Sequence, residues 1–111
     1  MEAHRYIQLR VHLDEQQIPD QIEWRADENQ ESWVKAKAFL LSIFEEQSKD
    51  TMKLDLWTSD FQMSEMDRFM YYSLRSLCDT YMRATNNTEL ANDFRSFIEH
   101  FGKQTELIQS S

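Results

Sequence analysis

The sequence predicts an α+β fold, in which an antiparallel sheet of about four strands is followed by two amphipathic helices packed on one face of the sheet. Three observations support this class. Apolar and polar residues alternate over much of the first half, the spacing becomes helical after residue 63, and capping residues precede both helical segments. The 111 residues fit a single domain, 1–111, in which 103–111 is expected to be a frayed tail.

The first two strands are expected at roughly 5–14 and 21–27. A polar connection that contains the only proline, Pro19, separates them, so they are expected to form a hairpin. Each strand should bury one face and expose the other. The apolar positions that alternate with polar ones are Ile7, Leu9, Val11 and Leu13 in the first strand, and Ile22, Trp24 and Ala26 in the second.

The segment 29–46 fits two structures, and periodicity alone does not separate them. We favour a short helical turn near 31–35 and a strand at 37–45, because Phe39, Leu41 and Ile43 alternate. The polar connection 46–50 would then return the chain to an antiparallel strand at 51–58. In the alternative, residues 31–46 form a helix, which gives a three-stranded sheet with three helices.

Two amphipathic helices are expected at 64–85 and 89–101. Ser64 and Thr88 are suitable N-caps, and the only glycine, Gly102, lies where a left-handed C-cap would end the second helix. If Phe97 is a core residue, its replacement by alanine would cost roughly 3 to 5 kcal/mol. The inward stripes are Met66, Met70, Leu74, Leu77, Tyr81 and Ala84 in the first helix, and Leu90, Phe94, Phe97, Ile98 and Phe101 in the second.

Charge and cysteine content restrict the class of partner and the compartment. The formal charge of -8 repels nucleic acids and anionic membranes. We therefore expect a protein partner, and we expect neither nucleic-acid binding nor membrane insertion. One cysteine, Cys78, cannot form an intrachain disulfide, and the N-terminus lacks the pattern of a signal peptide. The cytoplasm is therefore the expected location.

The sequence carries no recognisable catalytic, cofactor-binding or metal motif. A single glycine cannot supply a Gly-rich phosphate loop or a nucleophile elbow. His4, His12 and His100 are scattered and show no zinc-ligand spacing. We therefore expect a protein without enzymatic activity, cofactor or metal.

A partner surface is predicted around Trp57. This residue shares the outer face of its strand with Lys53 and Asp55, and aromatic anchors flanked by charge are typical of protein interfaces. Burial of Trp57 under a loop or a helix is the alternative. Tyr72 and Met82 lie outside the inward stripe of the first helix and complete the predicted surface, although a homodimer contact or the last helix could equally cover them.

Five segments in order carry a family resemblance: LDEQQIP at 13–19, IEWRA at 22–26, AKAFLLS at 36–42, LDLWT at 54–58 followed by Glu65 and Met66, and DTYMRAT at 79–85. Together they resemble the GldC family of gliding motility-associated proteins from Bacteroidota. The resemblance implies a cytoplasmic accessory protein that contacts components of the gliding machinery, and it assigns no catalytic residues. The alternatives are an acidic chaperone-like factor for secretion or envelope proteins, and a small-ligand-binding domain or enzyme with a pocket between sheet and helices.

Overall fold

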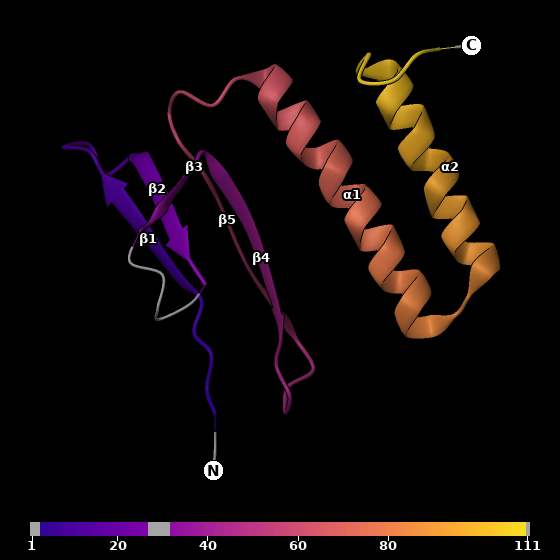
Figure 1. Cartoon of the computed structure of the whole chain (residues 1–111), viewed down its shortest axis with the longest axis horizontal. Helices are drawn as coiled ribbons and strands as arrows, with labels where there is room; N and C mark the ends of the chain where they lie inside the picture. The colour runs from indigo at the N-terminus through magenta and orange to yellow at the C-terminus, as the bar shows by residue number, and fades with distance from the viewer. Residues whose placement is uncertain (1–2, 27–31, 111) are drawn as a thin grey trace. The chain divides into compact units, whose positions relative to one another are not determined.

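The computed structural model describes residues 3–26 and 32–110, in which five strands are followed by two helices (Figure 1). This order confirms the α+β class and does not support the alternative with three helices. The chain divides into two compact units, a strand unit of residues 1–61 and a helical unit of residues 62–111. The elements are β1 (Gln8–Leu13), β2 (Pro19–Arg25), β3 (Val34–Ala36), β4 (Ala38–Phe44), β5 (Thr51–Trp57), α1 (Met63–Thr85) and α2 (Thr88–Gln104).

The strands form two antiparallel sheets instead of the single four-stranded sheet that we expected. One sheet has the order β1-β2-β3, and the other is the hairpin of β4 and β5. The chain bends at Lys37, between β3 and β4. The Lys37 carbonyl accepts a hydrogen bond of 2.8 Å from the backbone N–H of Thr58. The bend ends the pairing with β2 and begins the pairing with β5, which is why one continuous sheet does not form.

The helical turn expected near 31–35 is wrong where the structure describes it. Val34 and Lys35 belong to β3 and pair with Trp24 and Glu23 of β2. Residues 27–31, which include the end of the second expected strand, lie outside the described residues. Pairing with β2 therefore overrides the helical spacing of this segment, because each strand residue satisfies its backbone groups through a neighbour.

The three-stranded sheet has one apolar face, as the alternation predicted. Leu9 lies opposite Trp24, and Val11 lies opposite Ile22, which is fully buried. The burial of the first strand is nevertheless incomplete, because Leu9 keeps 40% and Leu13 keeps 43% of its surface exposed. Strand pairing begins only at residue 8, so residues 5–7 of the expected strand do not pair.

Both helices begin one residue earlier than the sequence predicted, and their N-caps lie two residues earlier for α1 and one residue earlier for α2. Gln62 caps α1 in place of Ser64, and its backbone N–H donates a 3.1 Å hydrogen bond to the Glu65 carboxylate. Asn87 caps α2 in place of Thr88, and its side-chain oxygen accepts a 3.1 Å hydrogen bond from the Leu90 N–H. At the start of each helix a side-chain oxygen accepts a hydrogen bond from a backbone N–H that has no partner within the helix.

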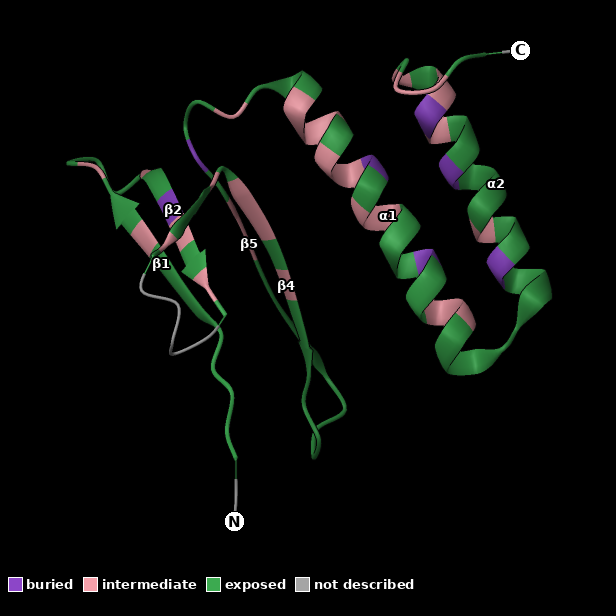
Figure 2. Cartoon of the chain, viewed as in Figure 1, coloured by how far each residue is buried: buried purple, intermediate pink, exposed green. Residues whose placement is uncertain are grey.

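The core of the helical unit lies between α1 and α2 (Figure 2). On α1, Tyr71 and Cys78 are buried, whereas Leu77, which we placed on the inward stripe, is 57% exposed. The Cys78 thiol donates to the Ala91 carbonyl at 3.4 Å, and this cysteine packs within the core. The buried members are Tyr71, Cys78, Ala91 and Ile98, with Leu74, Met82, Phe94, Phe101, Leu107 and Ile108 packed against them.

Gly102 does not end α2, contrary to our prediction. The helix continues to Gln104, and Gly102 is buried within it. A Cβ atom at this position would lie 2.7 Å from a ring carbon of Tyr71 and 2.9 Å from a side-chain carbon of Ile108. The glycine therefore permits close packing instead of a left-handed turn.

The expected frayed tail is also wrong over part of its length. The backbone N–H groups of Leu107 and Ile108 donate to the Gly102 carbonyl at 2.9 and 3.2 Å, and both side chains pack against the helical core. Burial of these apolar side chains stabilises the turn, and that of Ile108 lies against the glycine.

Candidate functional site

The structure brings together three of the five residues predicted for the partner surface. Lys53, Asp55 and Trp57 lie on the same face of β5, as the alternation required. Tyr72 and Met82 belong to α1 in the helical unit. The candidate site is therefore the outer face of the β4–β5 hairpin, and we call it the Trp57 face. The β4 residues on this face are Ala38, Leu40, Ser42 and Phe44, which pair with Trp57, Asp55, Lys53 and Thr51.

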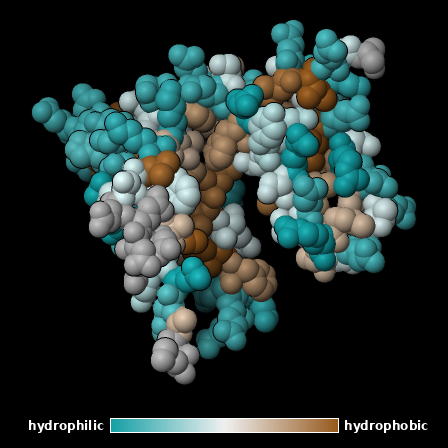
Figure 3. All heavy atoms as spheres, in the orientation of Figure 1, coloured by the Kyte–Doolittle hydropathy of each residue, from teal (hydrophilic) through white to brown (hydrophobic). Residues whose placement is uncertain are grey.

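Trp57 is exposed at the end of β5. Just over half of its surface, 53%, is open to solvent, so no described loop of the strand unit buries the side chain. Across the hairpin, Leu40 and Phe44 are also exposed. In Figure 3 hydrophobic residues form a band along β4 and β5. Leu40 lies diagonally across the hairpin from Trp57, and an exposed aromatic ring beside an exposed leucine is typical of an interface centre.

The two charged residues of the Trp57 face neutralise each other. The Lys53 ammonium lies 3.1 Å from one carboxylate oxygen of Asp55. The other oxygen, Oδ1, is buried and has no hydrogen-bond partner among the described residues. A buried acceptor without a donor is unfavourable, by about 1 to 3 kcal/mol in typical proteins.

The two predicted residues on α1 have different surroundings. Tyr72 is exposed, and the guanidinium groups of Arg68 and Arg75 lie 5.0 and 5.7 Å from the centre of its ring. Met82 packs against the buried core between the two helices. Met82 consequently contributes to the core, whereas Tyr72 presents an aromatic ring beside two positive charges.

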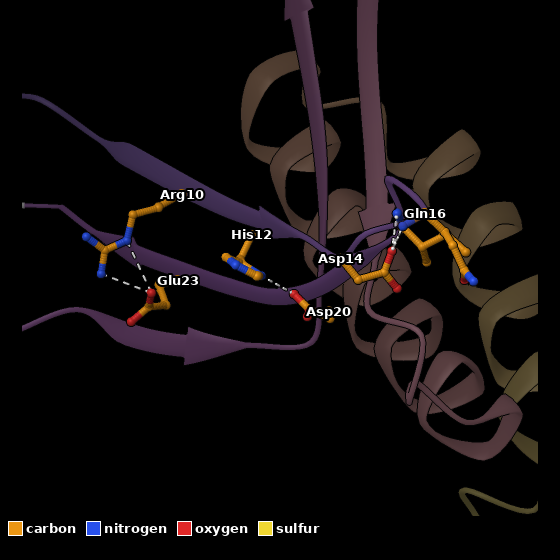
Figure 4. A network of polar contacts seen from close by, with 7 residues as sticks. Arg10, His12, Asp14, Gln16, Asp20 and Glu23 are labelled. Atoms are coloured by element: carbon orange, nitrogen blue, oxygen red, sulfur yellow. Dashed lines mark hydrogen bonds and ion pairs between the residues drawn. The ribbon is translucent and has the colours of Figure 1, made fainter.

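A polar network covers the other face of the β1–β2–β3 sheet (Figure 4). Arg10 donates to one oxygen of Glu23 from Nε at 3.2 Å and from Nη2 at 2.9 Å. Nδ1 of His12 lies 2.6 Å from Oδ1 of Asp20. The alternation placed Arg10 and His12 on the outer face, but it did not identify these pairs, because the partners depend on the register between β1 and β2.

Trp33 lies beside this polar network, and the guanidinium groups of two arginines stack over its ring. The guanidinium of Arg10 is 4.1 Å from the ring centre, and that of Arg25 is 4.4 Å from it. Arg25 also donates from Nε to the side-chain oxygen of Gln8 at 2.7 Å. These contacts explain why Trp33 faces the polar side of the sheet, since cation–π attraction replaces apolar burial.

A cavity of about 480 Å³ opens within the strand unit, beside the bend at Lys37. The Thr58 hydroxyl donates to the Asp60 carboxylate at 2.6 Å, and this bond lowers the pKa of Asp60 below its ordinary value of 3.8. Lys37, 3.9 Å from the second carboxylate oxygen, acts in the same direction. The lining contains two lysines and two aspartates, so its charges balance and favour neither a cation nor an anion. The lining residues are Asp20, Gln21, Ile22, Lys35, Ala36, Lys37, Thr58 and Asp60.

The described residues form no metal site and contain no membrane-spanning helix. Among residues 3–26 and 32–110, no three His, Cys, Asp or Glu side chains are grouped closely enough to hold a metal ion. Within the same described ranges, neither helix combines the length and the apolar character that crossing a membrane requires.

An apolar groove of about 760 Å³ runs along one side of the α1–α2 hairpin. Most of its lining is hydrophobic, and Leu77 and Leu90 are exposed there. The remaining lining residues are Thr80, Tyr81, Ala84, Asp93 and Phe94.

Comparison with known proteins identifies the family. A family model described as "Gliding motility-associated protein GldC-like" matches residues 19–107, a range that includes β2 to β5 and both helices. No curated protein and no solved structure matches the chain. Because the match covers most of the sequence, the chain belongs to the GldC-like family of gliding motility-associated proteins.

Proposed function

We propose that this protein is a non-enzymatic, cytoplasmic accessory factor of gliding motility that binds a protein partner through the Trp57 face. Family membership supports the association with gliding motility. The single cysteine agrees with a reducing compartment, and the single glycine is incompatible with the loops that phosphate and acyl-transfer chemistry require. The observation that carries the proposed contact is the half-exposed Trp57 on a regular strand.

Trp57 is suited to anchor such a contact. Tryptophan is enriched among the residues that dominate interface energies, and truncation of such anchors commonly costs about 2 kcal/mol or more. The ring sits on a hairpin whose backbone is already paired, so little ordering is needed when a partner binds. The proposed partner covers the ring together with Leu40, its diagonal neighbour across the hairpin.

The charges define the partner further. Lys53 already neutralises one oxygen of Asp55, while the buried Oδ1 lacks a donor among the described residues. The net charge of -8 favours association with a surface of opposite sign. The proposed partner therefore presents an apolar pocket with a basic rim.

The test compares Trp57→Ala with Met63→Ala in gliding cells. Met63 is a matched control, because its side chain is 83% exposed and lies outside the Trp57 face. Affinity capture of the tagged full chain should recover a motility component with the wild type and with Met63→Ala. The amount of motility component recovered with Trp57→Ala should be at least about tenfold lower than with the wild type. A tenfold weaker affinity corresponds to about 1.4 kcal/mol of binding free energy. Circular dichroism should show that both variants are folded.

Two results together would reject the proposal. The first is a deletion strain whose colonies spread normally. The second is a capture experiment in which wild-type protein recovers no motility or secretion component. Equal recovery by Trp57→Ala and the wild type would reject the Trp57 face as the contact site.

A chaperone-like factor for secretion or envelope proteins is the second candidate, and the apolar groove of the helical unit favours it. Exposed apolar patches of this kind bind apolar segments of other proteins. Asp93 in the groove favours clients whose apolar segments carry a basic residue. Purified protein should then suppress aggregation of a chemically denatured test protein, and Leu90→Glu should abolish the effect. Undiminished aggregation with the wild type would reject this candidate.

A further inference from the structure

A second cavity, of about 310 Å³, lies within the helical unit. α1 and α2 run side by side (Figure 1), and both helices and the turn that follows α2 contribute to its lining. The apolar part of the lining consists of Cys78, Ile98 and Ile108. This volume is at the lower end of the range for small-molecule sites, about 300 to 1,000 Å³. The cavity therefore has room for a small ligand.

Tyr71 brings an unpartnered hydroxyl to this cavity. The residue is 6% exposed and belongs to the core between the helices, and it is also part of the cavity lining. Its hydroxyl forms no hydrogen bond with a described residue. The hydroxyl is not sealed off, because the enclosed side-chain oxygen that lacks a partner in the described chain is Oδ1 of Asp55. A buried tyrosine usually bonds its hydroxyl, so a ligand in the cavity would complete the bonding of Tyr71.

Two arginines face each other across the hairpin, Arg75 from α1 and Arg95 from α2, and both line the cavity. Neither forms an ion pair with a described residue. The Arg75 guanidinium lies 5.7 Å from the ring centres of Tyr71 and Tyr72. Arg95 donates from Nη1 to the side-chain oxygen of Asn92 at 2.6 Å. Their positive charges are therefore held in place by uncharged groups.

The negative charges of the lining do not balance these two arginines. The lining contains the carboxylates of Asp79 and Glu99. Glu99 is neutralised by Lys103, whose ammonium lies 3.1 Å from one of its oxygens. Asp79 alone opposes the two guanidinium groups, which leaves one net positive charge in the described lining. A ligand with a single negative charge matches this balance, whereas Asp79 would repel the second charge of a dianion such as phosphate.

The cavity of the strand unit lacks this property. Its two carboxylates are already bonded within the strand unit, since Asp20 contacts His12 and Asp60 accepts from Thr58. Its lining charges balance, and its buried hydroxyl, that of Thr58, donates to Asp60. Of the two cavities, the one in the helical unit has uncommitted donors.

We propose that the cavity in the helical unit binds a small organic acid with one carboxylate group and an apolar body. The carboxylate accepts hydrogen bonds from the Tyr71 hydroxyl and from the Arg75 guanidinium, which binds carboxylates in a planar, paired geometry. The apolar body lies against Ile98 and Ile108. Because Arg95 belongs to the other helix, the bound acid bridges α1 and α2.

The experiment titrates the full-length protein with 4-methylpentanoate and follows its NMR signals. Signals of Tyr71, Ile98 and Ile108 should shift in a saturable way, with a Kd of about 1 mM or tighter for so small a ligand. Two control ligands are 4-methylpentanamide, which has the same shape without the charge, and inorganic phosphate. Each control ligand should bind at least about tenfold more weakly, because the first lacks charge-assisted hydrogen bonds and the second carries excess charge.

Two matched pairs of variants test the assigned donors. Tyr71→Phe should weaken binding of 4-methylpentanoate at least about tenfold, since a hydrogen bond to a charged group is lost. The same variant should keep its urea midpoint, because the hydroxyl has no partner among the described residues. Tyr72→Phe, outside the lining, should bind normally. Arg75→Gln should weaken binding at least about tenfold. Arg68→Gln is its control, because Arg68 also stacks on Tyr72 but does not line the cavity. If Arg75→Gln is unfolded, Arg95→Gln replaces it.

Several results would overturn the inference. They are the absence of saturable shifts at about ten times the expected Kd, equal affinity for 4-methylpentanoate and its amide, and equal affinity of Tyr71→Phe and the wild type. Tighter binding of phosphate would reject an organic acid as the ligand. The site lies outside the Trp57 face, and the titration contains no motility component. Either proposal can therefore fail while the other stands.

Discussion

Adjacent residues of α2 should differ sharply in their contribution to stability. Ile98 is 4% exposed and belongs to the core between the two helices. Its replacement by alanine removes buried methyl and methylene groups and leaves a cavity, for which roughly 2 to 5 kcal/mol is typical. Since a domain of this size has a net stability of about 5 to 15 kcal/mol, Ile98→Ala should lower the urea midpoint strongly.

Phe97 should behave differently, although the sequence placed it in the core. Its side chain is 54% exposed, and its described ring contacts are tilted ones with His100 and Phe101, each at 6.4 Å between centroids. Full burial of a phenylalanine is worth roughly 1.5 to 3 kcal/mol, so about half burial contributes about 1 kcal/mol. Little or no closed cavity forms on its removal, and the expected cost of Phe97→Ala is about 1 kcal/mol.

Urea unfolding followed by circular dichroism at 222 nm measures both variants, because the signal reports the helices. The slope of the free energy against urea should stay unchanged, so that the midpoints can be compared directly. Phe97→Glu gives a further check, since a half-exposed position tolerates a charge better than a buried one. A cost for Phe97→Ala equal to that for Ile98→Ala would refute the reasoning, and it would restore the sequence-based assignment of Phe97 to the core.

Three further predictions concern caps, packing and pH. Asn87→Ala should lower the unfolding free energy by about 1 kcal/mol, whereas Thr88→Ala should change it much less; equal effects in urea melts would contradict the observed cap. Gly102→Ala should destabilise by up to about 2 kcal/mol, because overpacking against an aromatic ring outweighs the gain of roughly 1 kcal/mol in helix propensity; a raised melting temperature would show that the ring yields. The Thr58 hydrogen bond holds the pKa of Asp60 below 3.8 in the folded state, so its stabilisation is present above the unfolded pKa and is lost as pH falls through the lowered one. Thr58→Val should raise the pKa of Asp60 in an NMR titration, and an unchanged pKa would exclude the hydroxyl as its cause.

Local periodicity accounts for much of the fold. Alternation is a property of the strand backbone, so it correctly placed Lys53, Asp55 and Trp57 on one face of β5. Helical spacing correctly located two amphipathic helices after the strands. The same reasoning failed around Val34, where the sequence fits a helix and a strand about equally well. Pairing with β2 makes this segment a strand.

The features of the fold that periodicity did not predict depend on contacts between residues far apart in the sequence. The Arg10–Glu23 pair follows from the register of β1 on β2, which no single strand contains. The exposure of Leu77 and the burial of Cys78 depend on the side of α1 along which α2 packs. An amphipathic stripe broad enough for two contacts cannot identify which contact is made.

The sequence by itself determined the α+β class, the order of strands and helices, and the resemblance to the GldC family, because periodicity and residue order are local properties. Only the tertiary structure decided that the strands form two sheets, that Gly102 serves packing instead of a helix end, and that Trp57 is exposed. The physical reason is common to all three. Residues that lie far apart in the chain decide which strands pair, how much space remains beside Gly102 and whether Trp57 is covered.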